Sequence, residues 1–202
     1  MKKKSEVWQG NKQKYLSNKP LMRFLNNKLK RDIILTLKNL NLNIKNILDI
    51  GCGEGFITSE VAKNFPKTKI TAIDPKEQYL NYAKKFNNLP NIRYEKKDLS
   101  YKFNRKFDLV IITEVLEHLP NPEESLKKTK RLSKKFILIT VPNEPFFRIG
   151  NLLALKYAKR LGNTPGHLHN WSKNQLYKIL TKLNFTFKIK TSTFWNIAII
   201  KK

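Results

Sequence analysis

A glycine-rich loop between an apolar run and a helical pattern constrains this 202-residue chain more than any other feature. The loop reads Asp49-Ile50-Gly51-Cys52-Gly53-Glu54-Gly55, and the run before it begins at Asn46. Glycines let a chain turn sharply and bring its backbone N–H groups and a helix N-terminus close to a ligand. The sequence therefore predicts a strand, a ligand-binding turn and a helix in succession.

Alternating strand and helix patterns continue to the end of the chain. Short runs rich in β-branched and other apolar residues predict seven strands. Their ranges are Asn46 to Ile50, Lys69 to Ile73, Ile92 to Glu95, Phe107 to Ile112, Lys135 to Val141, Phe185 to Lys190 and Trp195 to Lys201. Because helical patterns fill the gaps between the earlier runs, we expect a parallel α/β sheet.

Capping residues mark the helix starts. Asp74 and Asn121 each precede a proline and then a glutamate, which is an N-cap pattern. Ser172 begins a capping box that places the start of the last helix near Lys173. Residues 20–40 carry an apolar helical stripe that we expect to pack on the sheet. The stripe consists of Leu21, Phe24, Leu25, Leu29, Ile33, Ile34 and Leu37.

A formal net charge of +26 attracts anionic partners, so RNA, an anionic membrane surface and acidic metabolites are all candidates. The cations are 34 lysines and 7 arginines spread over nearly every segment, whereas phosphate recognition favours the arginine fork. We therefore interpret the charge chiefly as a solvated lysine-rich surface.

No apolar run approaches the roughly 18 residues that cross a bilayer, and the N-terminus lacks the apolar segment of a secretory signal. With Cys52 as its single cysteine, the chain is expected to be soluble and cytoplasmic.

The spacing of the glycines separates two classes of cofactor. A dinucleotide fingerprint, G-x-G-x-x-G, needs its third glycine where this chain has Phe56, and here the third glycine is Gly55. Asp49, two positions before the first glycine, would favour a cationic ligand over an anionic pyrophosphate. Three further motifs follow the next three predicted strands: Asp74-Pro75, Lys96-Lys97-Asp98-Leu99 and Thr113-Glu114-Val115-Leu116-Glu117-His118-Leu119.

With these four motifs in this order, the chain resembles the class I S-adenosylmethionine-dependent methyltransferases. The resemblance is strongest to the broad family that modifies small molecules and includes quinone-biosynthesis enzymes, and it runs from about Ile44 to the end of the chain. It implies a Rossmann-like fold, namely a seven-stranded, mostly parallel sheet with helices on both faces and an antiparallel last strand. It also implies S-adenosyl-L-methionine as the cofactor.

The resemblance assigns roles to individual residues. Asp49 and the glycine loop are expected to border the methionine moiety, Asp74 to hold the ribose hydroxyls, and Asp98 to lie beside the adenine. The segment that starts at Thr113 is expected to pass under the methionine end of the cofactor. The predicted cofactor-binding residues are Asp49, Gly51, Cys52, Gly53, Gly55, Asp74, Pro75, Asp98, Leu99, Thr113 and Glu114. The structural alternative for Asp74 is simple N-capping, and the two roles are compatible.

Transfer of a methyl group from a sulfonium needs alignment and exclusion of water, so we expect no metal and no covalent nucleophile. A hydroxyl acceptor would benefit from a histidine base, and the three candidates are His118, His167 and His169. The alternative for His118 is packing of its own helix, and for the other two it is anchoring of a loop. The alternation of His167 and His169 suggests a shared side, but without a nearby carboxylate or thiol a two-histidine zinc site would be incomplete.

We divide the chain into a basic N-terminal arm with a packing helix, residues 1–40, and a methyltransferase domain, residues 41–202. Within the domain, residues 142–170 are expected to form a lid or substrate insertion. Residues 146–161 have the pattern of a basic amphipathic helix that covers the site or, alternatively, makes peripheral membrane contact. The expected acceptor is a hydroxyl, or another nucleophile, of a small-molecule or lipid-linked substrate.

An RNA methyltransferase is the alternative function, since it would share the fold and suit the charge. Methyltransferases of exocyclic base amines resemble one another in an Asn/Asp-Pro-Pro-aromatic segment, where this chain has Thr113-Glu114-Val115-Leu116. Methylation of cytosine at carbon 5 needs a catalytic cysteine, and Cys52 lies in the cofactor loop. Both observations favour a small acceptor over RNA.

Overall fold

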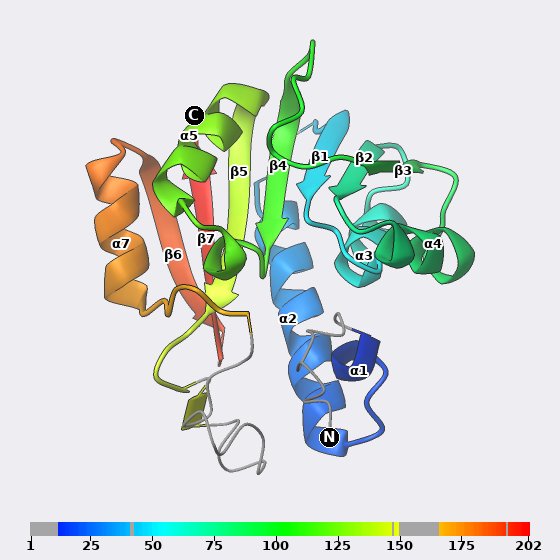
Figure 1. Ribbon diagram of the computed structural model, residues 1–202, viewed down its shortest axis with the longest axis horizontal. Coiled ribbons are helices and arrows are strands. Elements are labelled where there is room, and N and C mark those ends of the chain that lie inside the picture. Colours follow the sequence, from blue (N-terminus) through cyan, green and yellow to red (C-terminus); the bar gives the residue numbers. More distant parts are fainter. Residues whose placement is uncertain (1–11, 41–42, 147, 150–165, 193) are drawn as a thin grey trace, which may run out of the picture.

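A seven-stranded sheet forms the centre of the protein in the computed structural model, which describes residues 12–40, 43–146, 148–149, 166–192 and 194–202 (Figure 1). The strand order is β3-β2-β1-β4-β5-β7-β6. The strands are β1 (Asn46–Ile50), β2 (Lys69–Asp74), β3 (Ile92–Lys96), β4 (Phe107–Thr113), β5 (Ser133–Pro142), β6 (Thr186–Ser192) and β7 (Trp195–Lys201). The pairs among β1 to β5 are parallel, and β7 runs antiparallel to both of its neighbours. All seven predicted strands are confirmed, with ends that differ by at most two residues.

Burial along the strands follows their place in the sheet. All seven residues of β4 are buried because β4 lies centrally and both faces of the sheet are covered by helices. The first five residues of the edge strand β6 instead alternate between exposed and half-buried, which is typical of a strand with one covered face. The centre of the sheet is thus the rigid part on which loops at the strand ends are held.

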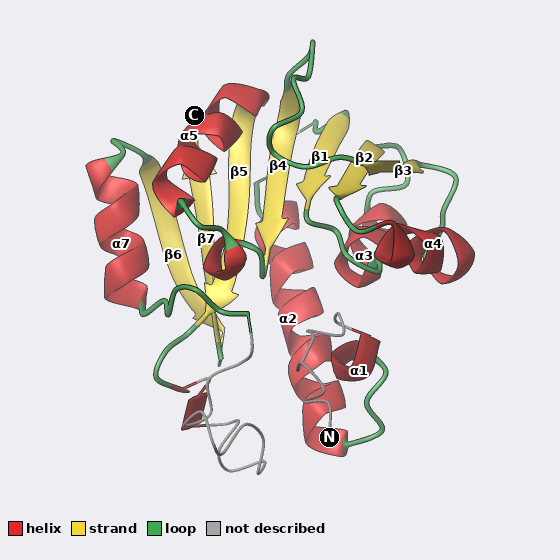
Figure 2. Ribbon diagram, in the orientation of Figure 1, coloured by secondary structure: helices red, strands yellow, loops and turns green. Residues whose placement is uncertain are grey.

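Helices cover both faces of the sheet (Figure 2). They are α1 (Lys12–Tyr15), α2 (Pro20–Lys38), α3 (Phe56–Asn64), α4 (Glu77–Phe86), the short 3₁₀ helix η1 (Leu116–His118), α5 (Pro122–Leu132) and α7 (Lys173–Lys182). Alternate residues of β4 point to opposite faces: Leu109 packs with α2 and α3, whereas Val110 packs with α5 and α7. In the described part of the chain, no helix has the length and apolar character needed to span a bilayer.

Two of the three predicted caps are confirmed. The Asn121 side chain accepts a hydrogen bond from the backbone N–H of Glu124, and Ser172 forms the expected capping box with Gln175. The prediction for Asp74 as an N-cap is wrong, because α4 begins at Glu77 and Lys76 occupies the cap position. Asp74 instead accepts hydrogen bonds from two backbone N–H groups that belong to the glycine loop and to the turn after β2.

The apolar stripe of α2 packs on the sheet along most of its length. Its buried members are Leu25, Leu29, Ile33, Ile34 and Leu37. Leu21 and Phe24 are exceptions, since 64% and 63% of their surfaces are exposed. The physical reason is that the first turns of α2 extend beyond the carboxyl ends of the strands, as Figure 1 shows. Most of the predicted insertion 142–170 and of the amphipathic segment 146–161 lies outside the described residues.

Candidate functional site

The carboxyl ends of the parallel strands bring most of the predicted site residues to one edge of the sheet. Asp49 is one residue from the end of β1, Asp74 ends β2, and Thr113 ends β4. β7 is antiparallel, so its first residue, Trp195, pairs with Pro142 at this same edge. In Figure 1, α1 and the first turns of α2 lie beyond these strand ends. These predicted site residues therefore lie at the same ends of the strands, with α1 and the start of α2 beyond them.

All three glycines of the loop have left-handed backbone conformations, with φ of 71° at Gly51, 54° at Gly53 and 80° at Gly55. Space is also short: a Cβ at Gly51 would lie 2.4 Å from Cγ2 of Val115, and one at Gly55 would lie 2.4 Å from the hydroxyl oxygen of Tyr94. The glycines are therefore needed by the loop for conformation and for packing.

The backbone N–H groups of the loop are mostly engaged within the protein. Those of Gly51 and Cys52 donate to the carbonyl oxygen of Ile73, at 2.8 and 3.0 Å. The N–H of Gly53 donates to Oδ2 of Asp74 at 3.0 Å, and that of Gly55 donates to the carbonyl of Cys52. These four amides do not form the ligand cradle that the glycine spacing suggests. Three of them join the loop to the end of β2, and the fourth closes a turn within the loop.

Asp49 is a buried carboxylate with one unmatched oxygen. Its Oδ2 accepts a hydrogen bond from the Thr58 hydroxyl at 2.6 Å, whereas its Oδ1 is buried with no hydrogen-bond partner among the described residues. Burial, and after it the charge of Asp74, raise the pKa of Asp49 to about 6. A cationic group next to Oδ1 would favour the ionised form. The buried carboxylate therefore suits a nearby ligand that carries positive charge, as S-adenosylmethionine does.

The other predicted cofactor residues occupy the same edge with different exposure. Asp74 is buried, and burial raises its pKa despite its two backbone hydrogen bonds. Asp98 is exposed after β3, where it accepts hydrogen bonds from the N–H and hydroxyl of Ser100, which lower its pKa. Leu99 packs on the core beside it. Pro75 is exposed, and burial keeps the Cys52 thiol protonated by raising its pKa.

Glu114 is the centre of a network that sequence reasoning did not foresee. Its backbone is left-handed, with φ of 55°, and its carboxylate is ion-paired with Lys14 of α1. The Trp195 indole N–H donates to Glu114 Oε1 at 2.8 Å, and the Tyr15 hydroxyl lies 3.3 Å from Oε2. Burial raises the pKa of Glu114, but Lys14 and the hydrogen bonds outweigh it, so the pKa is lowered overall. The network fastens α1 over the edge of the sheet.

Glu117, His118 and His167 form a second cluster. Their ligand atoms lie within 4.8 Å of one another, and the two imidazole rings are 4.9 Å apart between centroids. Burial, followed by the charge of Glu114, raises the pKa of Glu117 to about 8, and its Oε2 is buried without a hydrogen-bond partner among the described residues. The cluster is held by backbone, since the N–H groups of Leu168 and His169 donate to the carbonyl of Glu117.

Hydrogen bonding sets the tautomer of His118. Its Nδ1 lies 2.8 Å from the carbonyl oxygen of Gly166, and a carbonyl can only accept, so Nδ1 carries the proton and Nε2 is the unprotonated nitrogen. Burial lowers the pKa of His118, and burial together with the charge of His118 lowers the pKa of His167 to about 4. Both rings are therefore neutral near pH 7.

His169 has different neighbours from His167. Its Nε2 donates to the carbonyl of Leu119 at 3.0 Å, and its ring lies 6.0 Å from that of Trp171. It anchors the loop, as the structural alternative proposed. The expectation that no carboxylate lies near the two histidines is wrong for His167, because Glu117 is brought to it by the fold. Two histidines and a carboxylate at this spacing could hold a divalent cation.

The structure thus adds Lys14, Tyr15, Trp195 and Glu117 to the predicted site. Glu117 directly precedes His118 in a motif that the sequence analysis already names, so this adjacency could have marked Glu117 as a site residue. No local pattern marks the other three. They come from the N-terminal segment and from the last strand, and only the folded chain places them at Glu114.

Comparison with known proteins gives a family match and several relatives. Residues 16–188 match a sequence family described as a methyltransferase domain. The chain is 30% identical over 125 residues to the malonyl-(acyl-carrier protein) O-methyltransferase of Halalkalibacterium halodurans, covering 57% of this chain and 46% of the relative. It is also 30% identical over 162 residues to the ubiquinone biosynthesis O-methyltransferase of Rickettsia bellii, covering 75% of this chain and 66% of the relative. The chain thus spans about half to two thirds of the length of these relatives.

Among solved structures, the plantazolicin methyltransferase BpumL, in complex with SAH and a desmethylPZN analog, is similar in fold. The TM-score is 0.71 at 19% identity, and the match covers 92% of this chain and 86% of that one. At this identity the likeness concerns the fold alone. It agrees with the Rossmann-like, mostly parallel seven-stranded sheet expected from the sequence, which is confirmed.

Proposed function

The chain belongs to the methyltransferase domain family, and from that premise we propose that it transfers a methyl group from S-adenosylmethionine, in line, to a hydroxyl of a small-molecule or lipid-like acceptor. Two relatives named as O-methyltransferases support an oxygen as the acceptor atom. Neither name supports the alternative of an RNA substrate. The cofactor and the acceptor class are both part of the proposal.

One observation carries the proposal most directly: the buried oxygen of Asp49 that has no hydrogen-bond partner among the described residues, next to a loop of three left-handed glycines. A cofactor with positive charge near this carboxylate would favour its ionised form, whereas a pyrophosphate would oppose it. In the proposed complex, Asp49 and the glycines border the methionine part, and Asp74 accepts hydrogen bonds from the ribose. Asp98 and Leu99 lie on the adenine side, and Thr113 and Glu114 line the floor.

When bound, S-adenosylmethionine supplies an activated methyl group and becomes a neutral thioether after transfer. The contribution of the chain is to position the acceptor and to take its proton. We propose that Nε2 of His118 accepts the hydroxyl proton as the oxygen forms its bond to the methyl carbon, which leaves the imidazole singly charged. Glu117 and His167, within 4.8 Å, orient this ring and the acceptor oxygen. If the cluster held a divalent cation instead, the cation would acidify the acceptor hydroxyl at the same place.

The surroundings of the site favour an apolar or lipid-like acceptor. Large apolar side chains are exposed on the segments that lie beyond the strand ends, and these are Leu16, Leu21, Phe24, Phe146, Ile149 and Leu168. Phe146 and Ile149 are the described apolar residues of the segment 146–161, for which we propose contact with a lipid-like acceptor or with a membrane surface.

Calorimetric titration with S-adenosylmethionine tests the cofactor assignment. We expect Asp49→Asn to lose at least about tenfold in affinity, since it removes the charge and keeps the shape. Asp108→Asn is a matched control, because Asp108 is also a buried aspartate but accepts hydrogen bonds from Lys45 and Asn46 at the opposite ends of the strands. Binding of S-adenosylmethionine that is equally tight to both variants would refute the assignment.

Labelled S-adenosylmethionine and fractionated lysate identify the acceptor by following label into lipid, small-molecule, RNA and protein pools. Once an acceptor is known, His118→Gln should lower turnover far more than cofactor affinity, and His169→Gln should change turnover little. Chelation separates the two modes of activation: a base is insensitive to EDTA, whereas a cation-dependent site loses activity and regains it with Mg²⁺ or Zn²⁺. Label in RNA alone would overturn the proposed acceptor class.

A further inference from the structure

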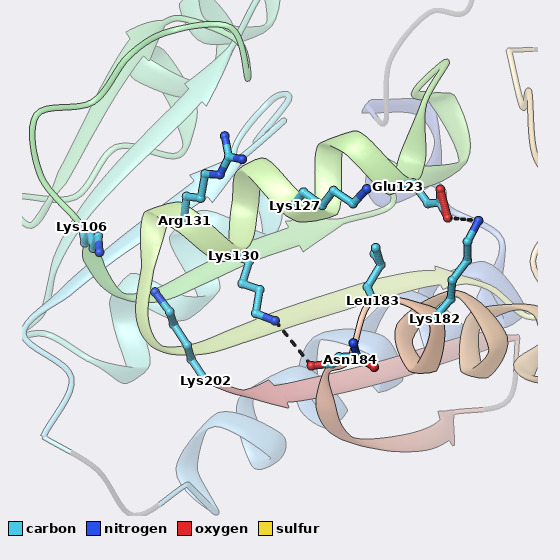
Figure 3. A pocket seen from close by; sticks show the side chains of 9 residues that line it. All are labelled: Lys106, Glu123, Lys127, Lys130, Arg131, Lys182, Leu183, Asn184 and Lys202. Carbon is cyan, nitrogen blue, oxygen red and sulfur yellow. Dashed lines mark hydrogen bonds and ion pairs between the residues drawn. The ribbon is translucent and has the colours of Figure 1, made fainter.

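A basic pocket lies at the edge of the sheet opposite the proposed methyl-transfer site. Lys106 immediately precedes β4, and Lys202 follows β7, which is antiparallel, so both mark the amino ends of the parallel strands. The pocket has a volume of about 570 Å³. Figure 3 shows the lining side chains on α5, at the end of α7, in the turn after it and at these two strand ends. They are Lys106, Glu123, Lys127, Lys130, Arg131, Lys182, Leu183, Asn184 and Lys202.

The lining holds six cationic side chains and a single carboxylate, Glu123. That carboxylate is already ion-paired with Lys182 at one end of the pocket. Lys130 donates to the carbonyl of Asn184 at 3.4 Å. Among the described residues, no carboxylate forms an ion pair with Lys106 or Arg131. The pocket therefore carries a surplus of positive charge that the protein does not neutralise locally.

The cations are close enough to repel one another. Burial and then the charges of Lys106 and Lys130 lower the pKa of Lys202. Lysines scattered over a convex surface separate into solvent and avoid this repulsion. Here, side chains from four separate parts of the chain are gathered around one concavity, so the high lysine content of the sequence does not by itself account for the arrangement.

We propose that this pocket binds a small molecule that carries a di- or triphosphate chain. Several cations around one concavity match the closely spaced negative charges of such a chain, and Arg131 can form a bidentate pair with a phosphate. No aromatic ring lines the pocket, so its described surface recognises charge and offers no platform on which a nucleobase could stack. Its volume lies within the range typical of sites for small ligands. The site is independent of methyl transfer, because it lies at the other edge of the sheet.

Calorimetric titration with inorganic triphosphate at about 150 mM salt tests the proposal, because screening at that salt suppresses diffuse attraction. The wild-type protein should bind one triphosphate in a saturable manner. The variant Lys106→Gln/Arg131→Gln should bind at least about tenfold more weakly. Both side chains are exposed, so circular dichroism should show an unchanged fold. The control variant Arg23→Gln/Lys84→Gln removes the same two types of charge from exposed positions elsewhere and should change affinity less than about twofold.

Three results would overturn the proposal. Equal weakening in the two double variants would mean that the triphosphate responds to net charge alone. Equal affinity for inorganic phosphate and triphosphate would mean that the pocket takes a single anion. A short single-stranded RNA that binds more tightly than triphosphate, and loses this binding only in Lys106→Gln/Arg131→Gln, would assign the pocket to nucleic acid.

Discussion

Asp49 is the residue on which the proposed site depends most. A buried acceptor without a partner costs free energy, and burial opposes its ionisation, as its pKa of about 6 reflects. Thr58 meets only one of the two oxygens. The fold therefore holds a buried acidic group whose ionised form would be favoured by a cation bound nearby.

Affinity for S-adenosylmethionine should depend on pH through Asp49. Its ordinary pKa of 3.8 is raised to about 6 in the protein, and a bound cation favours the ionised form, so the pKa falls when the ligand binds. Affinity should be constant above pH 6 and fall by up to about tenfold per pH unit below it. Calorimetry from pH 5 to pH 8 measures this profile.

Two variants show whether Asp49 is the titrating group. Asp49→Asn should flatten the profile. Thr58→Val removes the hydrogen bond that lowers the pKa of Asp49, so it should move the midpoint to higher pH. A wild-type affinity that is the same at pH 5 and pH 8 would contradict the assignment.

Gly51→Ala should destabilise the protein by about 2 to 4 kcal/mol, combining left-handed strain with overlap between the new Cβ and Val115. Gly166→Ala is the matched control: its φ is 88°, but the nearest atom to its Cβ would be 3.6 Å away. This variant should lose about 1 to 2 kcal/mol of stability, from the left-handed strain alone. Urea unfolding measures both, and equal losses would show that the contact with Val115 is easily relieved.

Short elements at the carboxyl edge are held by contacts that are distant in sequence. The segment 166–169 donates hydrogen bonds to the carbonyls of Glu117 and Leu119, at η1. The helix α1 is held at the end of β4 by the ion pair between Lys14 and Glu114. Tyr15 also stacks on Phe56, with ring centroids 4.8 Å apart. Elements of three or four residues have too few internal hydrogen bonds to be stable alone, so these contacts decide their positions.

Lys14→Met should cost about 3 kcal/mol or more, because it leaves the buried carboxylate of Glu114 without its cation. The pKa of Glu114 is lowered in the folded protein, so its contribution is present above the unfolded pKa of about 4.5 and is lost as pH falls through the folded value. The double variant Lys14→Met/Glu114→Gln should recover most of the loss at pH 7. Urea unfolding of the wild type, Lys14→Met, Glu114→Gln and the double variant gives the coupling energy. A double variant that is no more stable than Lys14→Met would exclude a charge effect.

Ser172→Ala should reduce stability by about 1 kcal/mol, since it removes the hydroxyl that accepts from the N–H of Gln175 at the start of α7. Lys173→Ala, at the next position, is the control and should change stability by less than about 0.5 kcal/mol. Thermal unfolding compares the two. Similar losses in both variants would show that the capping box does not limit the stability of α7.

At the scale of the whole molecule, the two edges of the sheet differ in chemistry. The carboxyl edge gathers buried acids, histidines and exposed apolar side chains, whereas the amino edge gathers cations around the pocket at Lys202. The net charge of +26 acts on both, because self-repulsion of this size opposes the compact state. Pairs such as Lys128 with Glu124 are exposed and offset little of it.

Salt should therefore stabilise the protein. Between about 20 and 200 mM NaCl the Debye length falls from about 20 Å to about 7 Å, which screens repulsion between distant lysines more than it weakens close pairs. The melting temperature should rise by several degrees over this range, as measured by circular dichroism, and sucrose at equal osmolality is the control for effects unrelated to charge. A melting temperature that falls with NaCl would show that local ion pairs outweigh the net repulsion.

Much of the fold could be predicted from the sequence, because strand and helix periodicity is local. The seven strand ranges, the caps at Asn121 and Ser172 and the three left-handed glycines follow from residues adjacent in the chain. The sequence also predicts that Asp49, Asp74 and Thr113 lie at one edge of the sheet, since the carboxyl ends of parallel strands lie together. The prediction of Asp74 as an N-cap was wrong because its carboxylate accepts a hydrogen bond from Gly53, 21 residues earlier in the chain. A local sequence pattern carries no information on that contact.

What the sequence determined by itself is therefore the order of elements and the glycine loop, because backbone conformation and burial periodicity act over a few residues. Only the tertiary structure decided that Lys14 and Trp195 contact Glu114, that His167 joins Glu117 and His118, and that cations from four segments surround one pocket. Each of these sets joins residues tens of positions apart. Their distances are set by how helices pack on the sheet and where the chain crosses it, which is a property of the whole core.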